Sequence, residues 1–145
     1  MRITTRGRYG LRAMVDMARH QGNGPVMMRA ITERQGIPRK YLHSLLMSLK
    51  GAELVRSLRG SRGGYVLAKD PSAITAREIL QALEGRICLV DCSERGSLCN
   101  MYGSCATRLL WADLGKLIEG HLNLVTLADL ANGKVSPPPR SGDRQ

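Results

Sequence analysis

Aromatic residues are scarce in this chain: its 145 residues include no phenylalanine, one tryptophan and four tyrosines. The core must therefore be aliphatic, and a hydrophobic share of 43% is sufficient for one small domain. Long apolar runs are also missing, and none approaches the roughly 20 residues that span a bilayer, so we expect no membrane partner. The basic N-terminus, with Arg2, Arg6 and Arg8, precedes no apolar signal-peptide core, which predicts a cytoplasmic protein.

Catalytic motifs are lacking as well. The three histidines are scattered as His20, His43 and His121, and no nucleophile–base set or carboxylate pair accompanies them. The glycine-rich stretch 60–64 lacks the Lys-Ser/Thr of a nucleotide-binding loop, and no helix begins after it. The sequence therefore predicts a protein that is not an enzyme.

Acidic residues are few in the first part of the chain. Residues 1–62 contain 13 Lys and Arg against three acids, whereas residues 63–145 contain nine against nine, so the first segment carries the whole net charge of +10. A solvated basic face is one interpretation of this asymmetry. Basic charge confined to one segment is also typical of a surface that binds nucleic acid phosphates.

The same segment contains a motif that could read the grooves of a DNA duplex. Apolar periodicity predicts helices at 8–20, 28–35 and 38–50, with Gly36 and Pro38 in the turn between the last two. The third helix carries polar residues opposite a stripe of Leu42, Leu45, Leu46 and Leu49. Two short helices joined in this way have the proportions of a helix-turn-helix.

A β-hairpin is expected next. Residues 54–58 and 65–67 have strand composition, and the stretch between them is glycine-rich with two arginines. This tip is either an ordinary mobile loop or the cationic wing of a winged helix, and arginines on a flexible tip favour the wing. The fold class is therefore mainly α with a small β-hairpin, a winged helix-turn-helix. A further helix starts at the capping box formed by Thr75 and Glu78 and ends near Gly85.

The C-terminal part begins with a long amphipathic helix predicted at 110–124. Its apolar residues either cover the winged helix or pack against a second copy of the chain, and we favour a homodimer. They are Leu110, Trp111, Leu114, Leu117, Ile118 and Leu122. A short helix at 126–130 and a disordered tail at 133–145 follow. The expected organisation is a DNA-binding domain at 1–84, a cysteine loop at 85–106 (called the cysteine segment below), and dimerisation and C-terminal helices at 107–132.

All four cysteines fall within the cysteine loop. In a reducing compartment such clustering indicates metal chemistry, although a thiol–disulfide switch stays open. Zinc is a weaker alternative, since no C-x2-C pair is present, and the wider spacings favour an iron-sulfur cluster. Cys92, Cys99 and Cys105 are the expected ligands. Cys88 lies in an apolar run and is better interpreted as a small buried side chain, with a fourth-ligand role as the less favoured alternative.

Several segments together resemble the IscR family of winged-helix regulators, whose relatives include the nitric oxide sensor NsrR and the iron regulator RirA. They are residues 1–9, 37–46 and 59–67, the three late cysteines, and Leu110 with Trp111. The resemblance implies a dimeric transcription factor, expected to be a repressor of iron-sulfur cluster assembly or related genes. It also implies double-stranded operator DNA, one 2Fe-2S or 4Fe-4S cluster per subunit, and cluster-assembly proteins as partners.

Two positions depart from the family pattern. Arg108 stands where the family has a histidine as fourth ligand, and an arginine cation does not bind iron. Asp91, Glu94, Cys88, His20 from elsewhere in the dimer, a water or a small thiol remain as alternatives, because Arg8 stands where nitric oxide sensors have an acid. His43 occupies the place of a glutamate that discriminates operator classes, so operator preference is expected to differ.

The expected DNA contacts form three groups. The recognition helix and the preceding helix would read the major groove through Met28, Arg39, Lys40, Tyr41, His43 and Ser44. The wing would reach the minor groove through Arg59, Ser61, Arg62 and Gly63, and the N-terminus would hold phosphates through Arg2, Thr4, Arg6, Arg8 and Tyr9. Two alternatives remain: a thiol-switched or cluster-free regulator of the same fold, and an iron-sulfur carrier whose basic half binds nucleic acid.

Overall fold

The computed structural model describes residues 2–94 and 99–135. Its first element, α1 (Thr5–His20), begins three residues before the predicted start at residue 8. Thr4 explains the difference, because its side chain accepts a hydrogen bond from the Arg6 backbone N–H and so caps the helix. The apolar periodicity starts only at Leu11, and the polar first turn therefore gave no signal.

The helix-turn-helix is confirmed as α2 (Met28–Gln35) and α3 (Arg39–Gly51). Gly36 ends α2 with φ of 63°, a left-handed conformation that glycine adopts without strain, and Pro38 precedes the first turn of α3. The predicted leucine stripe of α3 is fully buried. Each such leucine stabilises the fold by about 1.5–3 kcal/mol, so packing fixes the orientation of α3. A short 3-10 turn, η1 (Gln21–Asn23), links α1 to this motif.

The predicted hairpin consists of β1 (Val55–Leu58) and β2 (Gly64–Leu67), which pair antiparallel with Val55 opposite Leu67. Val26, just before α2, adds a bridge to β2: its backbone exchanges two hydrogen bonds of 2.8 Å with Tyr65. This bridge fixes the root of the hairpin to the start of the helix-turn-helix.

The chain returns to this core after a long excursion. Helix α4 (Ala76–Glu84) follows the short turn η2 (Pro71–Ala73) and begins at the predicted capping box of Thr75 and Glu78. Helix α7 (Leu127–Ala131) begins at a second capping box, and Leu127 is fully buried among residues of the winged helix. The Ala76 N–H donates to the Val125 carbonyl, and the Leu127 N–H to the Ile74 carbonyl, both at 2.8 Å. Helix α7 thus completes the core of the N-terminal part.

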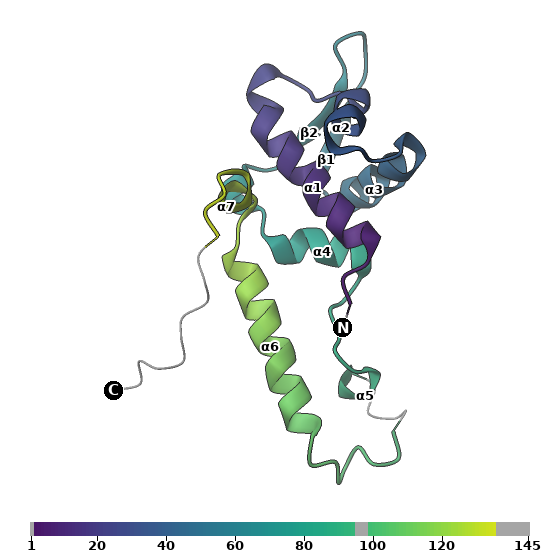
Figure 1. The fold of residues 1–145 in the computed structure, drawn as a ribbon, viewed down its shortest axis with the longest axis vertical. Helices are drawn as coiled ribbons and strands as arrows, with labels where there is room; N and C mark the ends of the chain where they lie inside the picture. Colours follow the sequence, from purple (N-terminus) through teal and green to yellow (C-terminus); the bar gives the residue numbers. More distant parts are fainter. Residues whose placement is uncertain (1, 95–98, 136–145) are drawn as a thin grey trace, which may run out of the picture.

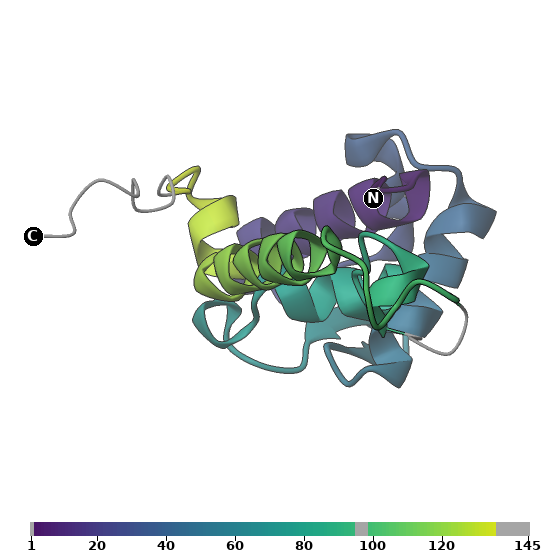
Figure 2. The same cartoon turned by 90° about the horizontal axis from the view of Figure 1, so that it is seen from below.

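Between α4 and α7 the chain forms α5 (Asp91–Glu94) and α6 (Arg108–Leu124). Helix α6 crosses below α4 and extends away from the core, with α5 and the cysteine segment beside its far end (Figures 1 and 2). The tail predicted at 133–145 falls almost entirely outside the described residues. Within the described part, no helix is long and apolar enough to cross a membrane.

Candidate nucleic-acid interface and cysteine segment

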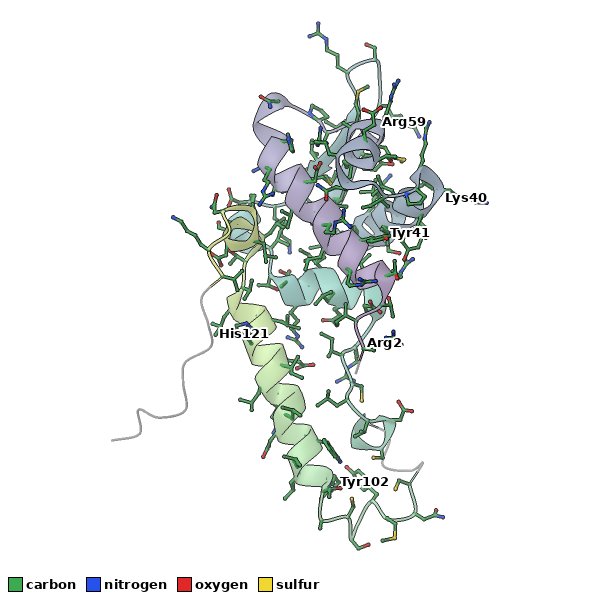
Figure 3. All side chains as sticks on the ribbon, viewed as in Figure 1. Arg2, Lys40, Tyr41, Arg59, Tyr102 and His121 are labelled. Atoms are coloured by element: carbon green, nitrogen blue, oxygen red, sulfur yellow. The ribbon has the colours of Figure 1, made fainter. Side chains whose placement is uncertain are left out.

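Helix α3 presents a polar face to solvent. Arg39, Lys40, His43 and Ser44 are exposed, while the leucines on the opposite face are buried. Met28 at the start of α2 is half-buried and lines a shallow depression together with Arg39, Lys40 and His43. The structure therefore brings five of the six expected groove-reading side chains to one surface. In the view of Figure 3, Lys40, Tyr41, Arg59 and Arg2 are all labelled in the right-hand half of the picture.

The hairpin tip carries Arg59, Ser61 and Arg62, all exposed. Gly60 has φ of 110°, a conformation that other residues rarely adopt. A Cβ on Gly63 would lie 2.3 Å from the Leu58 carbonyl oxygen, so any side chain there would force the tip open. Gly63, expected as a DNA contact, therefore has a role in the geometry of the tip, and its contact with DNA stays a prediction.

The expected N-terminal phosphate contacts have different environments. Arg2 and Arg8 are exposed, and Thr4 caps α1. Arg6 is half-buried, and its guanidinium donates hydrogen bonds to groups of α3 and α4. The structure thus leaves two of these arginines open to solvent and engages the third within the fold.

Tyr9 and Tyr41 form a pair that links α1 to α3. Their ring centroids are 5.9 Å apart with the planes at 78°, an edge-to-face contact, and both residues are half-buried. The Arg12 guanidinium lies 5.4 Å from the centre of the Tyr9 ring, a cation–π distance. Sequence reasoning did not single out Arg12, although its position one turn after Arg8 places both on the same side of a helix.

A buried ion pair joins α1 to α2. Asp16 is 2% exposed and accepts hydrogen bonds from Arg34 at 2.9 and 2.7 Å and from the Gln35 side chain at 3.0 Å. Burial raises the pKa of Asp16, but the hydrogen bonds from Arg34 and Gln35 outweigh it and hold the pKa below its ordinary value. Sequence analysis missed this contact. The signal that could have revealed it is that Asp16 is an acidic residue among the apolar residues 13–18 of a basic segment.

The three expected cluster ligands lie on consecutive parts of the cysteine segment. Cys92 is on α5, Cys99 and Cys105 precede α6, and all three are half-buried free thiols. The Thr107 hydroxyl is 3.3 Å from the Cys105 sulfur, and this hydrogen bond, aided by the Thr107 and Arg108 backbone, lowers the pKa of Cys105. A soft thiolate donor set suits iron-sulfur clusters. Within residues 2–94 and 99–135, no three His, Cys, Asp or Glu side chains are gathered as a ready metal site.

The alternatives for a fourth ligand are spread over the fold. The Cys88 thiol, half-buried as well, donates to the Val90 carbonyl at 2.9 Å. Asp91 is exposed on α5, whereas the side chain of Glu94 lies outside the described residues. His20 ends α1, at the opposite end of the molecule from the cysteine segment (Figure 1).

Arg108, at the family's histidine position, stacks on Tyr102 with 4.6 Å to the ring centre. Its Nε atom is buried without a hydrogen-bond partner in the structure. Buried nitrogen atoms of this kind normally have a hydrogen-bond partner. The start of α6 is therefore a place where the described residues leave a polar group unsatisfied.

Helix α6 has two apolar faces rather than the single stripe that we expected. Trp111, Ile118 and Leu122 share one side of the helix and are half-buried, and α6 packs against α4 and α5. Leucines on the rest of the apolar surface are exposed, and Leu109 and Leu124 were not singled out from the sequence. The exposed set is Leu109, Leu110, Leu114, Leu117 and Leu124. No residue of α6 is fully buried in the single chain.

Comparison with known proteins gives concordant results. The family described as Rrf2, iron-dependent transcriptional regulator, matches residues 3–133. The HTH-type transcriptional regulator IscR of Klebsiella pneumoniae is 40% identical over 134 residues, which are 92% of this chain and 82% of that protein. The IscR of Yersinia pestis is 41% identical over 92% of this chain and 81% of that protein.

Two solved structures show the same fold. The global cysteine regulator CymR of B. subtilis has a TM-score of 0.78 at 38% identity and covers 92% of this chain and 98% of its own. The IscR of T. potens has a TM-score of 0.75 at 37% identity over 92% of this chain and 88% of its own.

Proposed function

Because the chain belongs to the Rrf2 family of transcriptional regulators, we propose that it binds operator DNA as a homodimer under the control of an iron-sulfur cluster held by Cys92, Cys99 and Cys105. The observation that carries this proposal is helix α3. Its leucines are buried and its basic and polar residues are exposed beside a cationic hairpin tip. This is the arrangement that a winged helix uses to read a groove.

The exposed residues of α3 match the chemistry of the major groove. Arg39 and Lys40 donate to guanine or to phosphates, while His43 both donates and accepts. The half-buried Met28 offers an apolar surface suited to a thymine methyl group. At the wing, Arg59 and Arg62 are long enough and sufficiently exposed to enter the adjacent minor groove.

Dimerisation is supported by the outer face of α6. Leu110, Leu114 and Leu117 are 58%, 38% and 70% exposed and repeat at helical spacing. Packing this face against its copy would remove these leucines from water. A dimer would present two α3 helices, and successive major grooves of one duplex require such helices to be about 34 Å apart.

The cysteine segment is suited to a regulatory role by its position. It connects the end of α4 to the start of α6, and a change in its conformation therefore acts on both helices. A bound cluster would supply a group that responds to iron supply, oxygen or nitric oxide. Three of the four free cysteines of this segment are the ligands that we expect, and Arg108 stands at the position where the family has its fourth ligand.

A thiol switch without a cluster is the second candidate. The lowered pKa of Cys105, caused first by the Thr107 hydroxyl, increases its thiolate fraction at neutral pH. One similar solved structure is the oxidised form of CymR from Staphylococcus aureus, with a TM-score of 0.71 at 33% identity. This observation makes oxidation of the cysteines a competing form of control.

The test begins with protein purified without oxygen and a DNA duplex selected by that protein from a random-sequence pool. We expect a palindromic sequence to be enriched, iron and sulfide to copurify, and the visible absorption of the cluster to disappear in Cys99→Ala but not in the control Ser104→Ala. An unenriched pool would refute operator binding. Enrichment by a protein free of iron, even after anaerobic reconstitution, would favour the thiol switch.

A further inference from the structure

The Arg6 guanidinium lies at the junction of three helices. Its Nε–H donates to the Leu83 carbonyl at 2.9 Å, at the C-terminal end of α4. Its two terminal nitrogens donate to hydroxyls of α3: Nη1 to Ser44 at 3.2 Å, and Nη2 to Ser48. One side chain of α1 therefore connects the end of α4 with the recognition helix.

A second set of contacts fixes α1 to the same end of α4. The Glu84 Oε1 atom accepts hydrogen bonds from the Thr4 backbone N–H at 2.9 Å, the Thr4 hydroxyl at 2.6 Å and the Gly7 backbone N–H at 2.9 Å. These backbone groups are in the first turn of α1, where N–H groups have no partner within the helix. The carboxylate of Glu84 thus holds the start of α1 in place.

The helices approach closely where these contacts form. A Cβ on Gly7 would lie 2.4 Å from Glu84 Oε1, and a Cβ on Gly10 would lie 2.1 Å from a methyl group of Leu83. Both glycines and Leu83 are buried. Since the interface has no spare volume, a shift of the last turn of α4 must be passed on to α1 and its side chains.

We propose that Arg6 is a positioning residue that couples the cysteine segment to the recognition helix α3. Gly85 ends α4 and the cysteine segment follows directly, so Leu83 and Glu84 are the first residues that a change in that segment displaces. This inference rests on the proposed function and deepens it. The rigid fork of the guanidinium meets its three acceptors in one arrangement of α3 and α4 and loses at least one of them in another.

The competing role for Arg6 is the phosphate contact expected from the sequence. The two roles differ in their dependence on salt. Loss of a phosphate contact lowers the slope of log K against log salt by about one unit. Loss of an internal coupling residue leaves this slope unchanged and instead removes the effect of the cluster on operator affinity.

The experiment measures operator affinity by fluorescence anisotropy with the selected duplex, over a range of salt concentrations, for cluster-loaded protein and for the Cys99→Ala background. Wild type is compared with Arg6→Ala, which removes both the charge and the fork, with Arg6→Lys, which keeps the charge but loses the fork, and with Ser48→Ala, which loses one acceptor. Arg8→Ala is the matched control, because Arg8 is exposed and its guanidinium donates, within the described residues, to the Thr5 hydroxyl of its own first turn. Thermal unfolding checks that every variant is folded.

We expect wild type to show a coupling of ordinary size, about 5-fold or more in affinity. Arg6→Ala, Arg6→Lys and Ser48→Ala should reduce this ratio toward one, and Arg6→Ala should leave the salt slope unchanged although it removes a charge. Arg8→Ala should keep the ratio and lose about one unit of slope. Hydrogen exchange supplies a readout independent of DNA: the Gly7 amide should exchange faster in Glu84→Gln than in wild type.

Two kinds of failure are distinguishable. If wild type shows no difference between cluster-loaded and cluster-free protein, the proposed control by a cluster fails. If wild type shows the difference and Arg6→Lys retains it in full, or Arg6→Ala lowers the salt slope by about one unit, then Arg6 does not couple the two parts and the inference is overturned.

Discussion

The buried Asp16 carboxylate makes a strong prediction about stability. Asp16→Asn keeps the shape of the side chain but replaces one oxygen, which accepts from Arg34 or Gln35, by an NH2 donor. Hydrogen bonds to a charged group are worth about 1.5–3 kcal/mol each, and a donor facing a donor adds to the loss. Arg34 is partly exposed and regains water, so we expect a net loss of about 2–3 kcal/mol in the free energy of unfolding.

The assay is urea denaturation followed by circular dichroism, together with thermal unfolding. A loss of this size lowers Tm by about 5–10 °C in a chain of this length. Glu33→Gln on α2 is the matched control: Glu33 pairs with Arg29 at 2.8 Å, but both side chains are largely exposed. We expect no measurable loss from the control, because exposed ion pairs contribute little. If Asp16→Asn unfolds at the same urea concentration as wild type, the argument from burial is wrong.

The pH dependence of this effect has a definite sign. The pKa of Asp16 is lower in the folded protein than in the unfolded chain, so its contribution is fully present above the unfolded value, about 3.9. The contribution is lost as pH falls through the depressed folded value. The difference in stability between wild type and Asp16→Asn should therefore be constant near neutral pH and shrink below about pH 4.

Three further predictions concern other parts of the molecule. Gly63→Ala should open the hairpin tip, because its Cβ meets the Leu58 carbonyl, and should weaken operator binding with little change in Tm, as measured by anisotropy and calorimetry. Leu117→Glu should convert the dimer to monomers in sedimentation experiments, since Leu117 is 70% exposed in the single chain, and an unchanged dimer would exclude this face. Thr107→Val should slow alkylation of Cys105 at neutral pH by raising its pKa; an unaltered rate would show that Thr107 does not control the thiol.

Local patterns predicted the winged helix well. The leucine stripe of α3, the turn at Gly36 and the capping box at Thr75 are determined by residues close in sequence, and all three are confirmed. The start of α1 was placed late because its first turn is polar and is held by Glu84, some eighty positions away. No periodicity in a single helix reports such a contact.

The sequence predicted which side chains of the candidate site are exposed, but not the hydrogen bonds that these side chains make with other helices. The exposed residues of α3 and the hairpin tip lie where alternation of apolar and polar residues places them. By contrast, the engagement of Arg6 with α3 and α4 depends on the packing of three helices, and a sequence of basic residues does not distinguish an arginine bound to phosphate from one bound to Ser44. The sequence likewise predicted a single apolar stripe on α6. The half-buried and exposed parts of that stripe differ only in how α6 packs against the rest of the fold.

The return of α7 to the core makes the DNA-binding unit discontinuous along the chain. Val125 and Leu127 are 7% and 0% exposed, and their backbones bond to Ala76 and Ile74. A fragment that stops at residue 84 would leave part of this core open to water. The stretch from Gly85 to Leu124 thus leaves the core at the C-terminal end of α4 and returns to it at the N-terminal end of the same helix. The unit that holds α3 therefore needs residues from both sides of this stretch to close its core.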